Sequence, residues 1–298
     1  MRTFFIFLIL FALAALVSGL LAYPVWALLQ GFIDAPIHRV LGRVGMLALG
    51  IATILFLKRQ GLANKATLGY DLPRPLFIRQ MLWGFAAGLV LMAPIMMTLA
   101  YLDVRVLADK YAGASLSATL VKLILQGLLT GFAVAFVEET FCRGAMFTAI
   151  RRESGLLWAI VLPTLFYAAT HFLGGHLRIP AEQVNYLSGL QSALNLFERF
   201  ATPLEFADSF AALTAFGVLL SLIRWRTGVI AGCIGLHAGG VCVIVVMRNL
   251  TTTNAASSYA WLVGSYDGVI GWLMLIWIAI VAAIYWRISR PTPTHAAA

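Results

Sequence analysis

Charged residues are scarce in this 298-residue chain, where Asp, Glu, Lys and Arg make up only 11% of the sequence. An ordinary soluble domain contains about 25% charged residues. Because hydrophobic residues make up 61% of this chain, a water-soluble globule is excluded. Cysteine is also rare, and Cys142, Cys233 and Cys242 are odd in number and lack CxxC spacing. A disulfide framework and a thiolate metal site are therefore not supported.

Long uncharged runs divide the chain into candidate membrane spans, since about 20 apolar residues are needed to cross a bilayer. We predict an all-α, polytopic integral membrane helix bundle of about eight transmembrane helices, which forms a single membrane domain over residues 1–298. The fourth run is too long for one perpendicular crossing, so we expect it to tilt, kink or extend past the membrane surface. The predicted spans are 4–27, 44–57, 80–102, 118–150, 155–174, 207–223, 229–247 and 268–286.

The net charge of +9 comes from small groups of basic residues between apolar runs, without the continuous stripe that binds nucleic acid. With the N-terminus inside, 12 of the 21 lysines and arginines fall on the cytoplasmic side and 7 on the opposite side. This bias predicts that both termini are cytoplasmic. We expect a protein of the bacterial inner (plasma) membrane. Its first apolar run is too long for a typical signal peptide, so we expect an uncleaved helix.

A long outer loop, from about Gly175 to Phe206, contains apolar residues at helical spacing. Leu187, Leu190 and Leu194 recur with polar residues between them. This pattern predicts an amphipathic helix at the membrane interface. We favour a helix that packs over the bundle rather than a substrate lid.

Only two acidic residues, Glu138 and Glu139, lie deep inside an apolar run. A carboxylate at the centre of a membrane helix costs about 3 kcal/mol on insertion scales, so such a pair indicates a functional site. Glu139 and Arg143 are four residues apart and share a helix face, which leaves Glu138 free to face a cavity as a general base. The alternative is a structural ion pair beside one protonated glutamic acid.

Two histidines, His171 and His237, lie inside other predicted spans. Counted from the cytoplasmic ends of their spans, Glu138, His171 and His237 lie about 20, 24 and 17 Å deep at 1.5 Å per residue. A single buried histidine is more often a core residue than a ligand. Polar side chains at a similar depth on three helices can instead meet in a water-filled cavity, where water could attack a peptide bond.

These residues carry a family resemblance over about residues 118–250. They resemble the CPBP family, which comprises the type II CAAX prenyl proteases and the bacteriocin-processing or Abi proteins. The resemblance marks 118–250 as a catalytic core. The run Glu138–Arg143 matches the EExxxR motif, Tyr167–His171 resembles FxxxH with Tyr in place of Phe, and His237 opens a segment similar to HxxxN.

The resemblance implies an intramembrane endopeptidase. In family terms, Glu138 and His171 would activate the attacking water. Glu139 with Arg143 would position the site. His237, together with a nearby amide, would stabilise the negative oxygen that forms during hydrolysis.

One departure from the family pattern concerns this last step. Val241 stands four residues after His237, where the family has an amide, so another donor serves or the oxyanion site is weakened. The family is also often described as metalloproteases, and Glu138, His171 and His237 could supply three ligands of a zinc site. Since the sequence has no HExxH motif, we favour activation by glutamate without a required cofactor and keep Zn²⁺ as the alternative.

The sequence thus predicts an endopeptidase that hydrolyses a peptide bond of a membrane-associated protein or peptide. Its expected partners are the lipid bilayer and that substrate, with no nucleic acid. The alternative is a proteolytically inactive family member that acts as a membrane scaffold, immunity or binding protein, which Val241 would favour. Ion-coupled transport ranks last because the sequence shows no repeat-related pair of broken helices.

Overall fold

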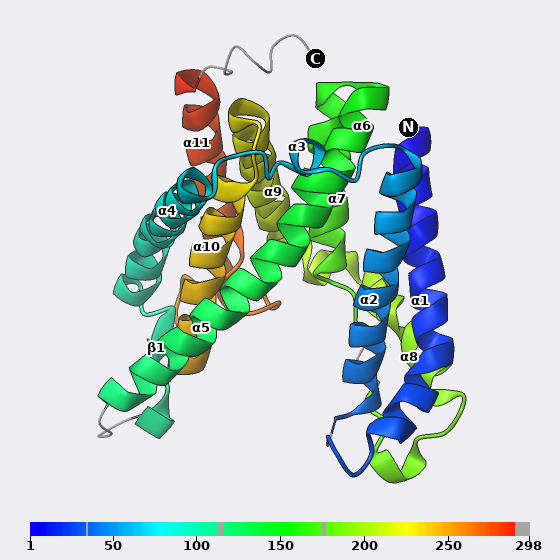
Figure 1. The fold of residues 1–298 in the computed structure, drawn as a ribbon. Coiled ribbons are helices and arrows are strands. Elements are labelled where there is room, and N and C mark those ends of the chain that lie inside the picture. Colours follow the sequence, from blue (N-terminus) through cyan, green and yellow to red (C-terminus); the bar gives the residue numbers. More distant parts are fainter. Residues whose placement is uncertain (34, 112–115, 175–176, 290–298) are drawn as a thin grey trace.

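The computed structural model describes residues 1–33, 35–111, 116–174 and 177–289 as a helix bundle with almost no strand (Figure 1). In this part of the chain, six helical segments are long and apolar enough to cross a membrane, and two apolar helices are shorter. The predicted all-α membrane bundle is confirmed. The eight segments contain α1 (Arg2–Leu29), α2 (Ile37–Arg59), α4 (Arg74–Tyr101), α5 (Leu116–Glu139), α7 (Leu156–Thr170), α9 (Ala207–Thr227), α10 (Ala231–Leu250) and α11 (Trp272–Ile288).

Each predicted span overlaps one of these helices, and the second shows the largest difference. Helix α2 begins at Ile37 rather than at residue 44. Its first turns therefore include Arg39 and Arg43, which the span prediction left outside the helix. Both arginines are exposed, because a long side chain at a helix end can extend its charged group to the membrane surface.

The fourth span is one helical segment of 38 residues, Ser117–Ser154. It contains all but the first residue of α5, the π-helical segment η2 (Thr140–Met146) and α6 (Phe147–Ser154). At 1.5 Å per residue such a segment is about 57 Å long, and α5 accordingly runs obliquely across the bundle (Figure 1). The wide turns of η2 begin directly after the two glutamates. Segments of π-helix are frequent at functional sites.

Glycines bring α10 into close contact with α4 and α5. A Cβ atom added at Gly239 would lie 2.5 Å from the backbone oxygen of Phe85 on α4, and one added at Gly131 would lie 2.5 Å from that of Ala238. Small residues let helix backbones approach closely in a membrane. This packing holds α10, and His237 with it, against α5. The glycines form three pairs with a spacing of four: Gly84 and Gly88, Gly127 and Gly131, Gly235 and Gly239.

We expect Gly239→Ala to destabilise the protein by about 1–3 kcal/mol, because the added methyl group overpacks the contact between α10 and α4. The matched control is Gly240→Ala, since a Cβ atom there meets nothing within 4 Å. Thermal unfolding of both purified variants in detergent checks this expectation. Equal melting temperatures for the two variants would contradict the packing role of Gly239.

Helix α1 begins and α11 ends on the same side of the bundle (Figure 1), as expected for an even number of crossings. The short helix α3 (Lys65–Leu68) lies on this side too. The predicted cytoplasmic basic residues belong to this side, except that Arg290 lies outside the described residues. That this side faces the cytoplasm stays a prediction.

Short elements lie at the opposite end of the bundle. Strand β1 (Arg105–Leu107) pairs antiparallel with β2 (Thr251–Thr253). The buried side chain of Arg105 donates hydrogen bonds to the hydroxyl groups of Thr251 and Thr253, and burial lowers the pKa of Arg105. The remaining 3₁₀ elements are η1 (Asp109–Tyr111), η3 (Ala181–Gln183), η4 (Asn195–Ala201), η5 (Pro203–Glu205) and η6 (Ala260–Leu262).

The predicted amphipathic helix is a single short α-helix, α8 (Ser188–Leu194), followed by η4. It packs on α1, and a Cβ atom at Gly189 would collide with the backbone oxygen of Gly19. Leu187 and Leu194 remain 62% and 72% exposed. The helix therefore packs over the bundle through its small residues, whereas these leucines face outward, as in a helix at a membrane interface.

Candidate active site

Helix α5 ends at the two glutamates and turns them to different surroundings. The side chain of Glu139 is fully buried, whereas that of Glu138 is 32% exposed. The α-helical rotation of about 100° between neighbouring residues explains this difference. One carboxylate therefore belongs to the interior of the bundle and the other remains accessible.

The Glu139 carboxylate holds two basic side chains. Its Oε1 lies 3.1 Å from Nη1 of Arg143 and 2.8 Å from Nδ1 of His237. Arg143 is fully buried and donates a second hydrogen bond from Nη2 to the backbone oxygen of Gly217, at 3.0 Å. The predicted pairing of Glu139 with Arg143 is present. The contact with His237 was not expected from the sequence, since 98 residues separate it from Glu139.

The contact with Glu139 determines how His237 presents its ring. A carboxylate paired with arginine can only accept hydrogen bonds, so Nδ1 of His237 carries a proton. In the neutral form of the ring, Nε2 has a free lone pair. This nitrogen lies 3.8 Å from Oε2 of Glu138, an oxygen that has no hydrogen-bond partner among the described residues. The gap is too wide for a direct hydrogen bond, and this carboxylate oxygen is itself buried.

His171 reaches this group only through Tyr167. Nδ1 of His171 lies 2.8 Å from the backbone oxygen of Tyr167, and because a carbonyl can only accept, Nδ1 is the donor. The Tyr167 ring contacts both imidazoles, with centroids 4.6 Å from His171 and 5.8 Å from His237. Among the described residues, neither a hydrogen bond nor an ion pair joins His171 to Glu138.

A cavity of about 680 Å³ lies beside Glu138. It is bounded by α1 and α2 on one side and by α5, η2 and α7 on the other, and its lining is mostly apolar. Its volume is typical of cavities that bind small molecules. Glu138 and Tyr167 line this cavity, whereas Glu139, Arg143 and His237 do not.

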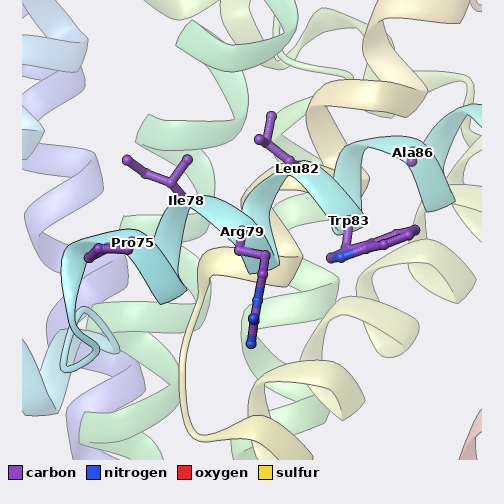
Figure 2. Close-up of a pocket in the computed structure, with 6 residues that line it drawn as sticks. All are labelled: Pro75, Ile78, Arg79, Leu82, Trp83 and Ala86. Atoms are coloured by element: carbon purple, nitrogen blue, oxygen red, sulfur yellow. The ribbon is translucent and has the colours of Figure 1, made fainter.

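A second, shallower depression lies on the surface of α4, and Figure 2 shows its lining residues. None of the predicted site residues lines it. Arg79 and Trp83 extend from the same side of the helix (Figure 2), and Trp83 is 73% exposed. Arginine and tryptophan are typical anchors at a membrane interface. This depression therefore supports placing the first turns of α4 near the membrane surface.

The side chains do not gather into a metal site. Within the described ranges, no three His, Cys, Asp or Glu side chains lie close enough to hold one metal ion. Glu138 and His237 approach each other, but His171 is directed to its own helix through Nδ1. The arrangement does not fit the three-ligand zinc site that Glu138, His171 and His237 could supply, and participation of Zn²⁺ stays a prediction.

Sequence reasoning missed two residues that position Arg143. Arg224 was counted among the cytoplasmic basic residues, but it is only 6% exposed and its Nε donates to the backbone oxygen of Arg143 at 2.9 Å. At Gly217, an added Cβ atom would lie 3.0 Å from Nη2 of Arg143. No pattern in the sequence distinguishes Arg224 from its neighbour Arg226, because both end the same apolar helix.

Comparison with known protein families gives a match that covers the candidate site. Residues 120–243 match the model of the type II CAAX prenyl endopeptidase Rce1-like family. The chain carries an Rce1-like domain. The match supports the CPBP resemblance, and the Rce1-like domain contains all of the predicted site residues. No curated protein and no solved structure matches the chain.

Proposed function

We propose that this integral membrane protein is an endopeptidase that hydrolyses a peptide bond of a membrane-associated protein or peptide. One observation carries the proposal: Oε2 of Glu138 and Nε2 of His237 face each other across 3.8 Å without a direct hydrogen bond. Glu138 also lines an apolar cavity. The Rce1-like match supports the assignment, since that family consists of endopeptidases.

In the proposed reaction, a water molecule lies between Glu138 and His237. Glu138 takes one proton as the water oxygen bonds to the carbonyl carbon, and the carbonyl electron pair moves to its oxygen. His237 accepts a hydrogen bond from the other water hydrogen through Nε2. The carbon–nitrogen bond then breaks, and the proton on Glu138 passes to the leaving nitrogen. The products are a new carboxyl terminus and a new amino terminus.

The buried pair of Glu139 and Arg143 supports this step indirectly. Glu139 fixes the tautomer and orientation of His237 by accepting from Nδ1, as carboxylates do for catalytic and metal-bound histidines elsewhere. Arg143 donates to the same carboxylate oxygen and so holds Glu139 in place. The role of His171 in water activation stays a prediction, for which its Nε2 retains a free lone pair.

The test of this function is a comparison of amino termini in the membrane fraction of cells that make either the wild type or Glu138→Gln. We expect new termini that occur only with the wild type, because cleavage creates one free amino group per event. Both proteins must be present at equal amounts in the membrane. Identical sets of termini would refute the proposal.

A second candidate function is that of a membrane scaffold, immunity or binding protein without proteolysis. Val241 favours it, because this side chain offers no hydrogen-bond donor one turn after His237. Under this function, Glu138→Gln would complement a deletion of the gene as well as the wild type does.

We further propose that water activation needs no metal, and a chelator tests this. Removing divalent metal from the purified protein is expected to leave the cleavage rate unchanged, because Glu138 can take the proton from water directly. Rates are measured before and after dialysis against a zinc chelator, together with the metal content. Activity that is lost and then returns on addition of Zn²⁺ would contradict the metal-free proposal.

A further inference from the structure

Hydrolysis of a peptide bond places negative charge on the carbonyl oxygen, and enzymes stabilise this oxyanion with preorganised hydrogen-bond donors. The identity of the donor that stabilises this oxyanion matters only if the proposed peptidase function holds, and the inference below rests on that function. We consider the side-chain donors on the helical segments that carry the predicted site residues, which are α5, η2, α7 and α10. Nε2 of His237 is already used in the proposed reaction, where it accepts a hydrogen bond from the attacking water while Nδ1 donates to Glu139.

The other donors near the glutamates are occupied or, like the unpartnered Nε of the fully buried Arg143, out of reach of the cavity. Arg143 directs Nη1 to Glu139 and Nη2 to the backbone oxygen of Gly217, and it is fully buried. The hydroxyl groups of two threonines that line the cavity donate to backbone oxygens of their own helical segment. These bonds join Thr140 to Phe136 at 2.6 Å and Thr170 to Tyr167 at 2.8 Å.

The hydroxyl group of Tyr167 is different. It makes no hydrogen bond within the described part of the chain. Tyr167 is only 2% exposed, and it lines the cavity together with Glu138. A donor without an acceptor, on a residue of the cavity wall that Glu138 shares, is available to an oxyanion formed in that cavity.

The ring of Tyr167 is also held in place. The Arg143 guanidinium lies 4.7 Å from the ring centroid, and the imidazoles of His171 and His237 pack against the ring edge-on. Such contacts fix the orientation of an aromatic side chain. The hydroxyl is therefore preorganised before substrate binds.

We propose that the Tyr167 hydroxyl donates the hydrogen bond that stabilises the oxyanion, so that Tyr167 is a catalytic residue. No proton is transferred from Tyr167. The proposal also joins two departures from the motifs that this chain resembles. At position 241, valine removes a donor one turn after His237, and at position 167 tyrosine adds a hydroxyl on the facing helix α7.

The test compares kcat and KM for the full-length protein in lipid nanodiscs. The probe is a quenched fluorescent peptide that spans a cleavage junction found only with the wild type. Tyr167→Phe removes one oxygen and keeps the ring, and we expect kcat to fall by about 10²- to 10³-fold with KM unchanged. The matched control is Tyr70→Phe, which removes a hydroxyl that contacts Thr140 but does not line the cavity; its kcat should remain that of the wild type.

A second variant separates catalysis from structure. In the Tyr167→Phe background, Val241→Asn places an amide on the same face of α10 as His237, and we expect part of kcat to return. A structural role for Tyr167 would not be rescued in this way. A wild-type kcat in Tyr167→Phe, or a raised KM with unchanged kcat, would overturn the oxyanion role of Tyr167. In that case, loss of cleavage in Glu138→Gln would still support the peptidase function. A wild-type protein that cleaves nothing would overturn both.

Discussion

Replacing Glu138 with glutamine is expected to lower kcat by about 10³-fold, the contribution of a general base, while the protein remains folded. The amide keeps the shape of the side chain but cannot take a proton from water. The Glu138 side chain is 32% exposed and makes no direct hydrogen bond, so its replacement leaves no buried partner without a contact. The measurement is cleavage of the junction peptide by purified protein, combined with thermal unfolding.

A matched control for this variant is Glu182→Gln, which removes an exposed carboxylate from η3, away from the cavity. It should cleave at the wild-type rate. If Glu138→Gln cleaved as fast as this control, Glu138 would not be the base, and the proposed reaction would be wrong.

The second large effect concerns the buried ion pair. Replacing either Glu139 with glutamine or Arg143 with methionine is expected to lower the free energy of unfolding by about 3–5 kcal/mol, because the remaining charge stays buried without its partner. Both side chains are fully buried in the structure. Chemical or thermal unfolding in detergent measures the loss.

The double variant, with both substitutions, separates stability from activity. Removing both charges should restore much of the stability, since a neutral pair in a buried site needs no compensation. Cleavage should not return, because a glutamine at position 139 no longer fixes the tautomer of His237. A stable and active double variant would support the alternative of a purely structural ion pair. Losses that simply add would contradict the coupling of Glu139 with Arg143.

The helices could be predicted because one physical requirement governs them. In a bilayer the backbone must satisfy its own hydrogen bonds, so a long apolar run forms a helix whatever it packs against. The beginning of α2 was predicted less well, since charged residues such as Arg39 end an apolar run without ending the helix. The π-helical segment η2 has no hydropathy signal, because its composition resembles that of the α-helix before it.

The site was predictable where its geometry is local. The spacing of four residues between Glu139 and Arg143 sufficed to pair them, as the structure shows. The depth estimate for His171 and His237 gives a distance along the membrane normal but no direction around the helix axis. The contact between His237 and Glu139 depends instead on how closely α10 approaches α5. The glycine pairs at a spacing of four were the signal for that approach, although they do not identify the partner helix.

The helices on the two sides of the cavity beside Glu138 differ in how closely they pack on the rest of the bundle. On one side the wall helix α5 is held against α10 by glycine contacts, whereas α1 and α2 on the other side pack mainly on each other and on α8. A change in acyl-chain length alters the tilt of transmembrane helices through hydrophobic mismatch. The loosely attached pair would respond first, so we expect the thickness of the surrounding bilayer to alter the width of the cavity.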